Sequence, residues 1–230
     1  MYLAYHAMKI VYEDNHIIIA LKAPGEIVQG DKTGDTPLLE MVREYIREKY
    51  NKPGNVFCGL VHRIDRPVGG LVLFARTSKA LTRLNEMIRR GLIHKTYRAI
   101  VQGHPEVPEQ RLEGYITSDS RTNKSYIHNS PRPDAKHVIL DYRMLRRGER
   151  YSLMEINLLT GRKHQIRAQL SALGHPIVGD LKYGARRSNP DGSICLQAHR
   201  LRLIHPVSGK EIDVTAPSPD NHPLWNSDPS

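Results

Sequence analysis

Cysteine is scarce in this chain, and its scarcity excludes two classes of small domain. The 230 residues contain only Cys58 and Cys195, which lie far apart and form no CxxC pair. A zinc finger or ribbon needs paired cysteines, and a disulfide framework needs more than two. We therefore interpret each cysteine as a small buried residue in a reducing, cytoplasmic compartment.

Long apolar runs are also absent. No stretch approaches the roughly 18 consecutive apolar residues of a membrane-spanning helix. Residues 1–9 have neither an extended apolar run nor a small-residue cleavage site, so no secretory signal is expected. With 39% hydrophobic residues, we predict one soluble domain over residues 8–217, or at most two tightly joined lobes, and a flexible tail over 218–230. No long apolar surface stripe stands out, which favours a monomer.

Clustered acids and glycine-rich phosphate loops are missing too. His62 lies near Asp65, and His164, His175 and Asp180 share one region, but no HExxH spacing or cysteine partner occurs. A metal-dependent hydrolase is expected to gather several carboxylates around its ion. We therefore expect no metal site, and we keep a nuclease that uses His62, Asp65 and Asp180 as an alternative.

Positive charge is what the chain has in excess. Lysine and arginine outnumber aspartate and glutamate by 34 to 24, which gives a net charge of +10. Such an excess favours a polyanionic partner, because each cation placed against a phosphate releases a condensed counterion. The alternative is an ordinary basic surface.

Hydrophobic periodicity predicts a mixed α+β fold. A hairpin is expected over 9–22, and helices after Thr36-Pro37, after Ser78 and from about Arg162. Further strands are expected over 56–61, 71–75, 95–101, 138–145, 151–159, 195–204 and 211–214. Residues 104–135 are rich in polar and turn residues, so we interpret them as a surface excursion with one strand near Tyr115.

Asp65 is the first candidate for chemistry. It stands in the segment His62-Arg63-Ile64-Asp65-Arg66-Pro67, between two apolar runs, where proline and the following glycines forbid regular structure. The flanking arginines should keep its carboxylate ionised. A reactive side chain on a loop of a rigid scaffold is a common active-site arrangement. The alternative is an aspartate that satisfies turn amides or a surface ion pair.

Two further segments carry cations. The segment from Gly161 to Arg167 places Arg162, Lys163 and Arg167 near the start of a predicted helix, where the helix dipole disfavours positive charge. An RNA phosphate, a carboxylate or both should offset that charge; the alternative is a solvated basic face. Tyr97 lies among basic residues on a predicted strand, where it can stack a base or simply pack a sheet face.

Four ordered blocks together resemble the RluA family of RNA pseudouridine synthases. They are His62-Arg63-Ile64-Asp65 with Gly70 and Ala75-Arg76-Thr77; Lys95-Thr96-Tyr97-Arg98-Ala99; Leu159 to Arg167 with Gly174-His175-Pro176; and Leu196 to Leu203 with His205-Pro206. The likeness runs from about Ile10 to Pro217. It implies an α+β fold with a mixed, mainly antiparallel sheet, a central cleft and flanking helices.

The resemblance also implies residue roles and a reaction without a cofactor. Asp65 would act at the ribose of a uridine in ribosomal or transfer RNA, and Arg167 would pair with Asp65. Tyr97 would stack on the flipped base, and Arg63 would fill the gap that the base leaves. The remaining expected contacts are RNA contacts by Arg162 and Lys163, pocket walls from Ile166 and Leu196, and a mainly structural His62.

The chain departs from the family pattern at two points. Val68-Gly69 stands where the family usually has Thr-Ser, and we expect altered loop packing there. Lys163 replaces a common threonine, which adds a candidate phosphate contact. An RNA-binding module without catalysis stays an alternative, and no required protein partner is evident.

Overall fold

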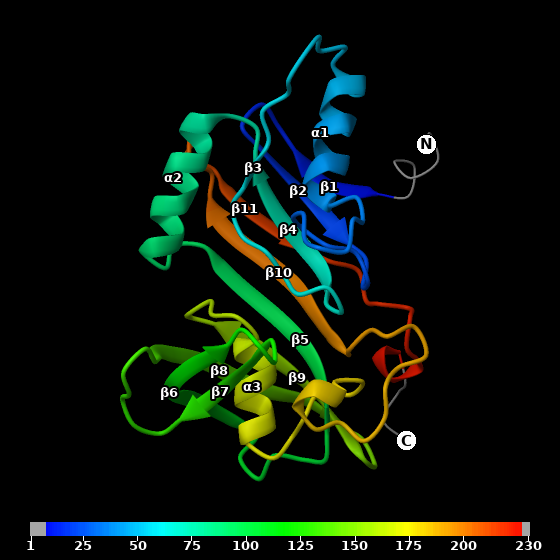
Figure 1. Cartoon of the computed structure of the whole chain (residues 1–230), viewed down its shortest axis with the longest axis vertical. Coiled ribbons are helices and arrows are strands. Elements are labelled where there is room, and N and C mark those ends of the chain that lie inside the picture. The colour runs from blue at the N-terminus through cyan, green and yellow to red at the C-terminus, as the bar shows by residue number, and fades with distance from the viewer. Residues whose placement is uncertain (1–7, 227–230) are drawn as a thin grey trace. The chain divides into compact units, whose positions relative to one another are not determined.

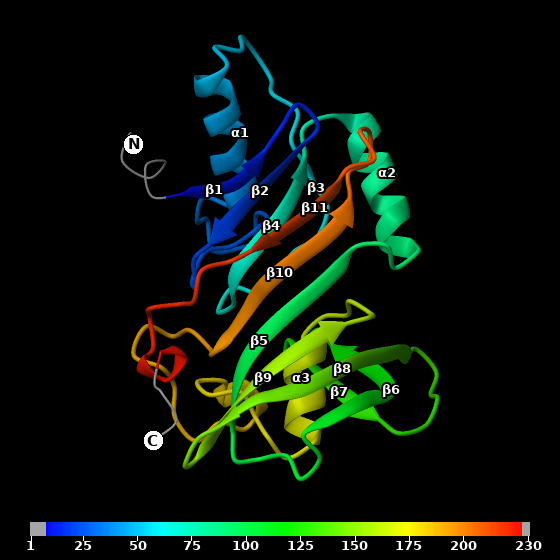
Figure 2. The ribbon, with the colours of Figure 1, turned by 180° about the vertical axis from the view of Figure 1, so that it is seen from behind.

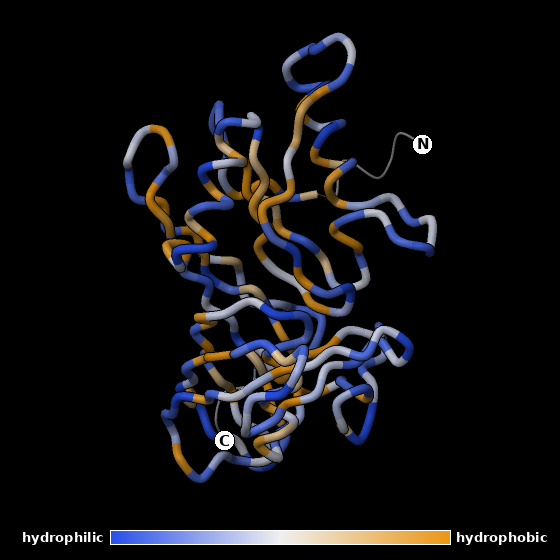
Figure 3. The backbone as a smooth tube through the Cα atoms, turned by 60° about the vertical axis from the view of Figure 1, so that its left-hand side comes forward, coloured by the Kyte–Doolittle hydropathy of each residue, from blue (hydrophilic) through white to orange (hydrophobic). Residues whose placement is uncertain are grey.

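The computed structural model describes residues 8–226, which divide into two compact units. The first unit comprises residues 8–93 and 200–216, and the second comprises 94–199 and 217–226. Strand β10 (Leu196–Ile204) contributes its first half to the second unit and its second half to the first. Figure 3 shows hydrophilic stretches along the outer loops of both units.

The first unit is built of strands and two helices (Figures 1 and 2). Antiparallel ladders join β1 to β2, β2 to β4, β3 to β4 and β10 to β11. Its elements are β1 (Lys9–Glu13), β2 (Ile17–Lys22), α1 (Leu38–Lys49), β3 (Gly59–Leu60), β4 (Gly69–Ala75), α2 (Ser78–Arg89) and β11 (Glu211–Thr215).

The core of the first unit explains why β4 reads as a continuous apolar run. All seven residues of β4 are buried. Leu71 and Leu73 pack with Ile17 and Ile19 of β2, and Ala80 and Leu84 of α2 close the same cluster. Burying each such side chain stabilises the fold by about 1.5–3 kcal/mol. The strand is thereby a rigid support for the loop before it, which carries Asp65.

The second unit is a five-stranded antiparallel arrangement with one α-helix. Ladders join β5 to β9, β9 to β8, β8 to β6 and β6 to β7. Helix α3 lies over β7 and β8 in both views (Figures 1 and 2), and its Ala168 packs with Ile116 and Val138. The elements are β5 (His94–Gln102), β6 (Glu109–Asp119), β7 (Lys124–His128), β8 (Lys136–Arg147), β9 (Tyr151–Leu158), α3 (Gln165–Ala172) and the short 3₁₀ turns η2 (Leu181–Tyr183) and η3 (Pro223–Trp225).

The sequence predictions of fold class, first hairpin, three helices and last hairpin are confirmed, and several boundaries are wrong. The run 56–61 has a ladder only at Gly59–Leu60. Thr77, not Ser78, caps α2, because its hydroxyl accepts the Ala80 amide at 3.1 Å. Pro37 occupies the N-cap position of α1 rather than its first turn.

Two larger corrections fall in the second unit. The strand expected near Tyr115 within residues 104–135 is part of β6, but β6 is longer than expected and pairs with a second strand, β7, that polarity hid. Helix α3 begins at Gln165 rather than near Arg162, because His164 has a left-handed backbone (φ +55°) that precedes the helix.

The segment after Pro217, which the sequence predicts to be a flexible tail, makes defined contacts as far as residue 226. Trp225 is buried, and Arg146 donates a hydrogen bond to the Leu224 carbonyl at 2.9 Å. Gln197 donates to the Pro217 carbonyl at 2.7 Å. Residues 227–230 of that predicted tail lie outside the described residues. None of the helices in the described part of the chain has the length and apolar character needed to cross a membrane.

Candidate functional site

Asp65 lies in the first unit, on the loop of residues 61–68 between β3 and β4. Its side chain is half-buried, and its carbonyl accepts the Val68 amide at 3.0 Å, which closes a turn. His62 supports the loop from below, because its Nε2 accepts the Leu73 amide of β4 at 3.2 Å. The loop thus rests on a buried strand, and Asp65 itself is only partly buried.

Lys22 anchors the loop that carries Asp65, although no sequence prediction named Lys22. Its side chain is 1% exposed, and its amine donates to the carbonyls of Ala23 and Arg66 at 2.9 and 3.0 Å. Burial, supported by the nearby charge of Arg66, outweighs the opposing charges of Glu26 and Asp65 and lowers the pKa of Lys22 to about 8. A lysine that directly precedes Ala23-Pro24-Gly25 was the available signal.

The glycines after Asp65 are required by close packing. A Cβ at Gly69 would stand 3.2 Å from Cδ of Pro24, and Gly70, opposite Lys22 on β2, has a positive φ of +119°. Val68 is buried at 2% exposure. Gly69 therefore lets the loop pack closely against Pro24. This close packing explains why a glycine stands at position 69.

The two arginines beside Asp65 differ in their contacts. Arg66 forms an ion pair with Asp35 and donates to the Thr33 hydroxyl at 3.2 Å. That the two arginines keep Asp65 ionised stays a prediction. Arg63 is exposed, and within residues 8–226 its side chain makes no hydrogen bond or ion pair. Arg63 is therefore free to contact a ligand.

Arg167 lies in the second unit, on the first turn of α3, and is buried. Its guanidinium donates two hydrogen bonds to Asp180, from Nε at 2.7 Å and from Nη2 at 2.8 Å. The exposed fractions of these two side chains are 7% and 1%. A carboxylate thus offsets the helix dipole, as the sequence led us to expect, and that carboxylate is Asp180. Pairing of Arg167 with Asp65 stays a prediction.

Tyr183 of η2 also contacts Arg167, and no sequence pattern had marked it. Its ring lies under the Arg167 guanidinium at 5.0 Å, a cation–π contact. Its hydroxyl accepts the Ser125 amide at 2.8 Å and lies 2.9 Å from Nδ1 of His164. Burial raises the pKa of Tyr183. A tyrosine three residues after Asp180 carried no distinctive pattern.

The other predicted residues of the second unit differ in exposure. Arg162 and Lys163 are exposed on the turn before α3, where the Lys163 carbonyl accepts the Ser125 hydroxyl at 2.9 Å. Three side chains are buried to 6% exposure or less: Tyr97 of β5, Ile166 of α3 and Leu196 of β10. Contacts of these five residues with RNA or with a uracil pocket stay predictions.

The alternative of a metal-dependent nuclease needs Asp180 as a metal ligand, but this carboxylate already has another partner. Both carboxylate oxygens of Asp180 are engaged by the buried guanidinium of Arg167. In the part of the chain that the structure describes, no group of three His, Cys, Asp or Glu side chains is placed to hold a metal ion.

Comparison with known proteins identifies the family. The family model for RNA pseudouridylate synthases matches residues 16–172, which include Asp65, Tyr97 and Arg167. The chain is 31% identical over 230 residues to a "Ribosomal large subunit pseudouridine synthase D" of Zymomonas mobilis, with 94% of this chain and 71% of that protein covered. It is 30% identical to a "tRNA pseudouridine synthase C" of Pectobacterium carotovorum, with 91% of this chain and 58% of that protein covered.

A solved structure is similar over nearly the whole chain. "Human RNA Pseudouridylate Synthase Domain Containing 1" is 25% identical to this chain, with a TM-score of 0.75. The similarity covers 97% of this chain and 88% of that protein. The matched region carries the Asp65 loop, the Tyr97 strand and the Arg167 helix in the order that the sequence blocks predicted. This chain belongs to the RNA pseudouridylate synthase family.

Proposed function

We propose that this chain converts specific uridines of ribosomal or transfer RNA to pseudouridine, with Asp65 as the catalytic carboxylate. The observation that carries the proposal is the family match over residues 16–172, which contains Asp65 on a loop anchored to β2 and β4. The names of the two curated relatives supply the two RNA classes. The net charge of +10 suits either RNA.

In the proposed reaction, the bond between uracil N1 and the ribose anomeric carbon breaks, and the uracil turns. A new bond forms from C5 to the same carbon, and the C5 proton is lost as N1 gains one. The reaction is a redox-neutral isomerisation, so its chemistry requires no cofactor. Asp65 acts at the sugar, by attack on the anomeric carbon or by removal of a neighbouring sugar proton.

The target base must leave its stack before Asp65 can reach the ribose, which costs a few kcal/mol. We assign Arg63 to the gap that the base leaves, because its exposed guanidinium has no partner within residues 8–226. Tyr97 stacks on the extruded base, with Ile166 and Leu196 as apolar walls. Arg167 is a positioning residue that orients Asp65 and keeps it anionic.

Exposed cations hold the RNA strand in this proposal. Arg162 and Lys163 contact phosphates from the turn before α3, and His62 holds the loop with a minor RNA contact. We further propose that the chain acts as a monomer without a required protein partner.

The test uses ribosomal and transfer RNA transcripts that carry tritium at uridine C5. Tritium released to water reports pseudouridine formation. We expect release by the wild-type protein and by Asp220→Asn, an exposed control, and none by Asp65→Asn, with RNA affinity retained. Normal release by Asp65→Asn would refute the assignment of the catalytic carboxylate.

A chelator separates the nuclease alternative. Without the chelator, a metal-dependent nuclease would cut the transcripts, and the chelator would stop it. A synthase should release tritium with or without the chelator and leave the transcripts intact. Binding of RNA without tritium release from any transcript would instead support a non-catalytic module. Mapping pseudouridines in total RNA with and without the gene would identify the target uridine.

A further inference from the structure

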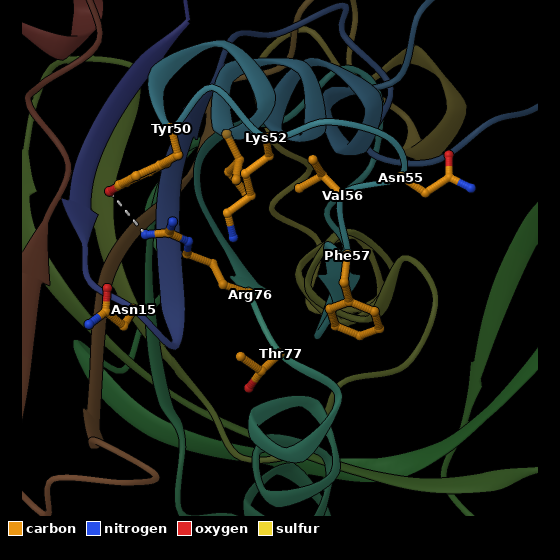
Figure 4. Close-up of a pocket in the computed structure, with 9 residues that line it drawn as sticks. Asn15, Tyr50, Lys52, Asn55, Val56, Phe57, Arg76 and Thr77 are labelled. Atoms are coloured by element: carbon orange, nitrogen blue, oxygen red, sulfur yellow. Dashed lines mark hydrogen bonds between the residues drawn. The ribbon is translucent and has the colours of Figure 1, made fainter.

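The first unit contains a cavity of about 400 Å³ between the end of α1, the β1–β2 turn and the start of α2 (Figure 4). Its volume lies within the range of small-ligand sites. The lining residues that matter here are Asn15, Tyr50, Lys52, Phe57, Arg76 and Thr77.

This cavity is remote from Asp65. The Asp65 loop enters β4 at Gly69, whereas Arg76 and Thr77 follow the last residue of β4, Ala75. At about 3.3 Å per residue, the eight steps from Val68 to Arg76 span roughly 26 Å. A ligand here would therefore not be the reacting uridine.

Part of the cavity wall is fixed by internal contacts. Arg76 donates to Glu13 at 3.1 Å and to the Tyr50 hydroxyl at 3.2 Å, and its guanidinium lies 4.4 Å from the Tyr50 ring centre. The Tyr50 hydroxyl in turn donates to Glu13 at 2.7 Å. These contacts hold the Tyr50 hydroxyl and Nη1 of Arg76 in place at the floor of the cavity.

Lys52 and Phe57 are not committed in this way. Within residues 8–226 the Lys52 amine has neither an ion pair nor a hydrogen bond, and Phe57 is 44% exposed although Val56 and Cys58 on either side are buried. Figure 4 shows the Lys52 amine and the Phe57 ring on opposite sides of the open space above Thr77. No acidic residue lines the cavity. A cation and a bare aromatic ring thus share one concave, non-acidic site.

We infer that this cavity binds a nucleotide of the single-stranded RNA that flanks the target uridine. Phe57 stacks on its base, and Lys52 contacts its phosphate. Proteins that hold single-stranded RNA combine a cation with an aromatic platform in this way, and every base offers a face to stack. The inference rests on the proposed function, because it names a second contact with the same substrate.

The geometry favours an RNA strand over a free nucleotide. Of the two aromatic rings that line the cavity, Tyr50 already lies against the Arg76 guanidinium, which leaves Phe57 to stack on a base. A lone nucleotide would therefore gain one stacking contact and one phosphate contact. A strand already held at Asp65 gains the second contact at a high effective concentration.

The binding experiment uses a fluorescein-labelled single-stranded oligouridine, with uridine monophosphate as the free-nucleotide probe. We expect Phe57→Ala to weaken oligouridine binding about tenfold, and Phe57→Tyr to keep wild-type affinity. Lys52→Ala should reduce the slope of log affinity against log salt by about 0.7. Leu92→Ala is the matched control, because Leu92 is 43% exposed in the same unit and does not line the cavity.

Tritium release from the transcripts separates this site from the catalytic one. Over a range of RNA concentrations, Phe57→Ala should raise KM about tenfold and reach the wild-type kcat at saturation. Asp65→Asn should instead lose kcat. Equal oligouridine affinity of Phe57→Ala and wild type would overturn the inference and leave the proposed function standing. Tighter binding of uridine monophosphate than of oligouridine, lost in Phe57→Ala, would overturn it in favour of a free nucleotide.

Discussion

The guanidinium of Arg167 and the carboxylate of Asp180 form a bidentate ion pair that is buried in the second unit, at 2.7 and 2.8 Å. Arg167 sits on α3 and Asp180 immediately before η2. A planar guanidinium held by two parallel hydrogen bonds keeps one orientation. The pair therefore fixes the direction of the side chain that we propose as the positioning residue for Asp65.

We predict that Asp180→Asn lowers the free energy of unfolding by about 3 kcal/mol, because it leaves the Arg167 charge buried without its counterion. Turnover should fall at least tenfold as the guanidinium loses its fixed direction. Urea unfolding and tritium release measure the two effects. Unchanged stability would show that Asp180 does not hold the charge of Arg167.

The double variant Arg167→Met/Asp180→Leu separates structure from function. Replacing both charges by apolar side chains removes the unpaired charge, so most of the lost stability should return. Turnover should not return, because no guanidinium remains to orient Asp65. A double variant that is both stable and active would contradict the role of Arg167.

Gly179, next to Asp180, supplies a second prediction. It has a positive φ of +88°, and a Cβ there would stand 2.7 Å from the Ser193 carbonyl oxygen. Gly179→Ala should destabilise the protein by about 3 kcal/mol, from backbone strain plus displacement of a neighbouring backbone. Gly184→Ala is the control, with φ +100° and open space around its Cβ, and should cost only about 1 kcal/mol. Thermal unfolding of the two variants compares these costs, and equal costs would contradict the close packing.

Arg63→Ala and Tyr97→Phe test the proposed handling of the flipped base. Without Arg63, the gap in the RNA stack is unfilled. Tyr97→Phe keeps the ring for stacking but removes the hydroxyl, which we propose assists removal of the uracil C5 proton. We expect each to lose most turnover in the tritium assay while keeping its folded stability, because neither change empties the core. Arg90→Ala, an exposed arginine of the first unit, is the control and should turn over normally. Wild-type turnover in both variants would remove these residues from the mechanism.

The sequence predicted β4 from its continuous apolar run and α2 from apolar residues at helical spacing, because burial on both faces produces the first pattern and burial of one face the second. It found a strand near Tyr115, which is part of β6, but missed the first half of β6 and all of β7, because neither segment contains an apolar run. The start of α3 was also misplaced, since nothing in the sequence marks His164 as left-handed.

The site residues divide in the same way. Asp65 and Arg167 were found from local pattern, because loops with proline and paired glycine and cations at a helix start are readable from neighbours in the sequence. Lys22 and Tyr183 were not found, because their roles depend on partners 44 and 58 residues away, Arg66 and Ser125. Such contacts follow from tertiary packing alone.

The burial of Lys22 makes the free energy of unfolding depend on pH. Its folded-state pKa is about 8, against 10.5 for the free group, because burial disfavours the charged amine. Between these values the unfolded chain holds a proton that the folded protein has lost, so the free energy of unfolding rises with pH across this window. The full difference corresponds to the order of 3 kcal/mol. The neutral amine still carries two N–H donors, which match its two carbonyl partners, Ala23 and Arg66.

We therefore predict that wild-type stability rises between about pH 8 and pH 10.5 relative to Lys22→Met, which has no amine to titrate. Lys79→Met, at an exposed lysine, should follow the wild type across the same range. Urea unfolding at several pH values measures the differences, and parallel curves for wild type and Lys22→Met would show that this amine does not titrate in the window. At pH 7, Lys22→Met should also lower kcat about tenfold with RNA affinity unchanged, since the carbonyl next to Asp65 loses its tether and the carboxylate its fixed position.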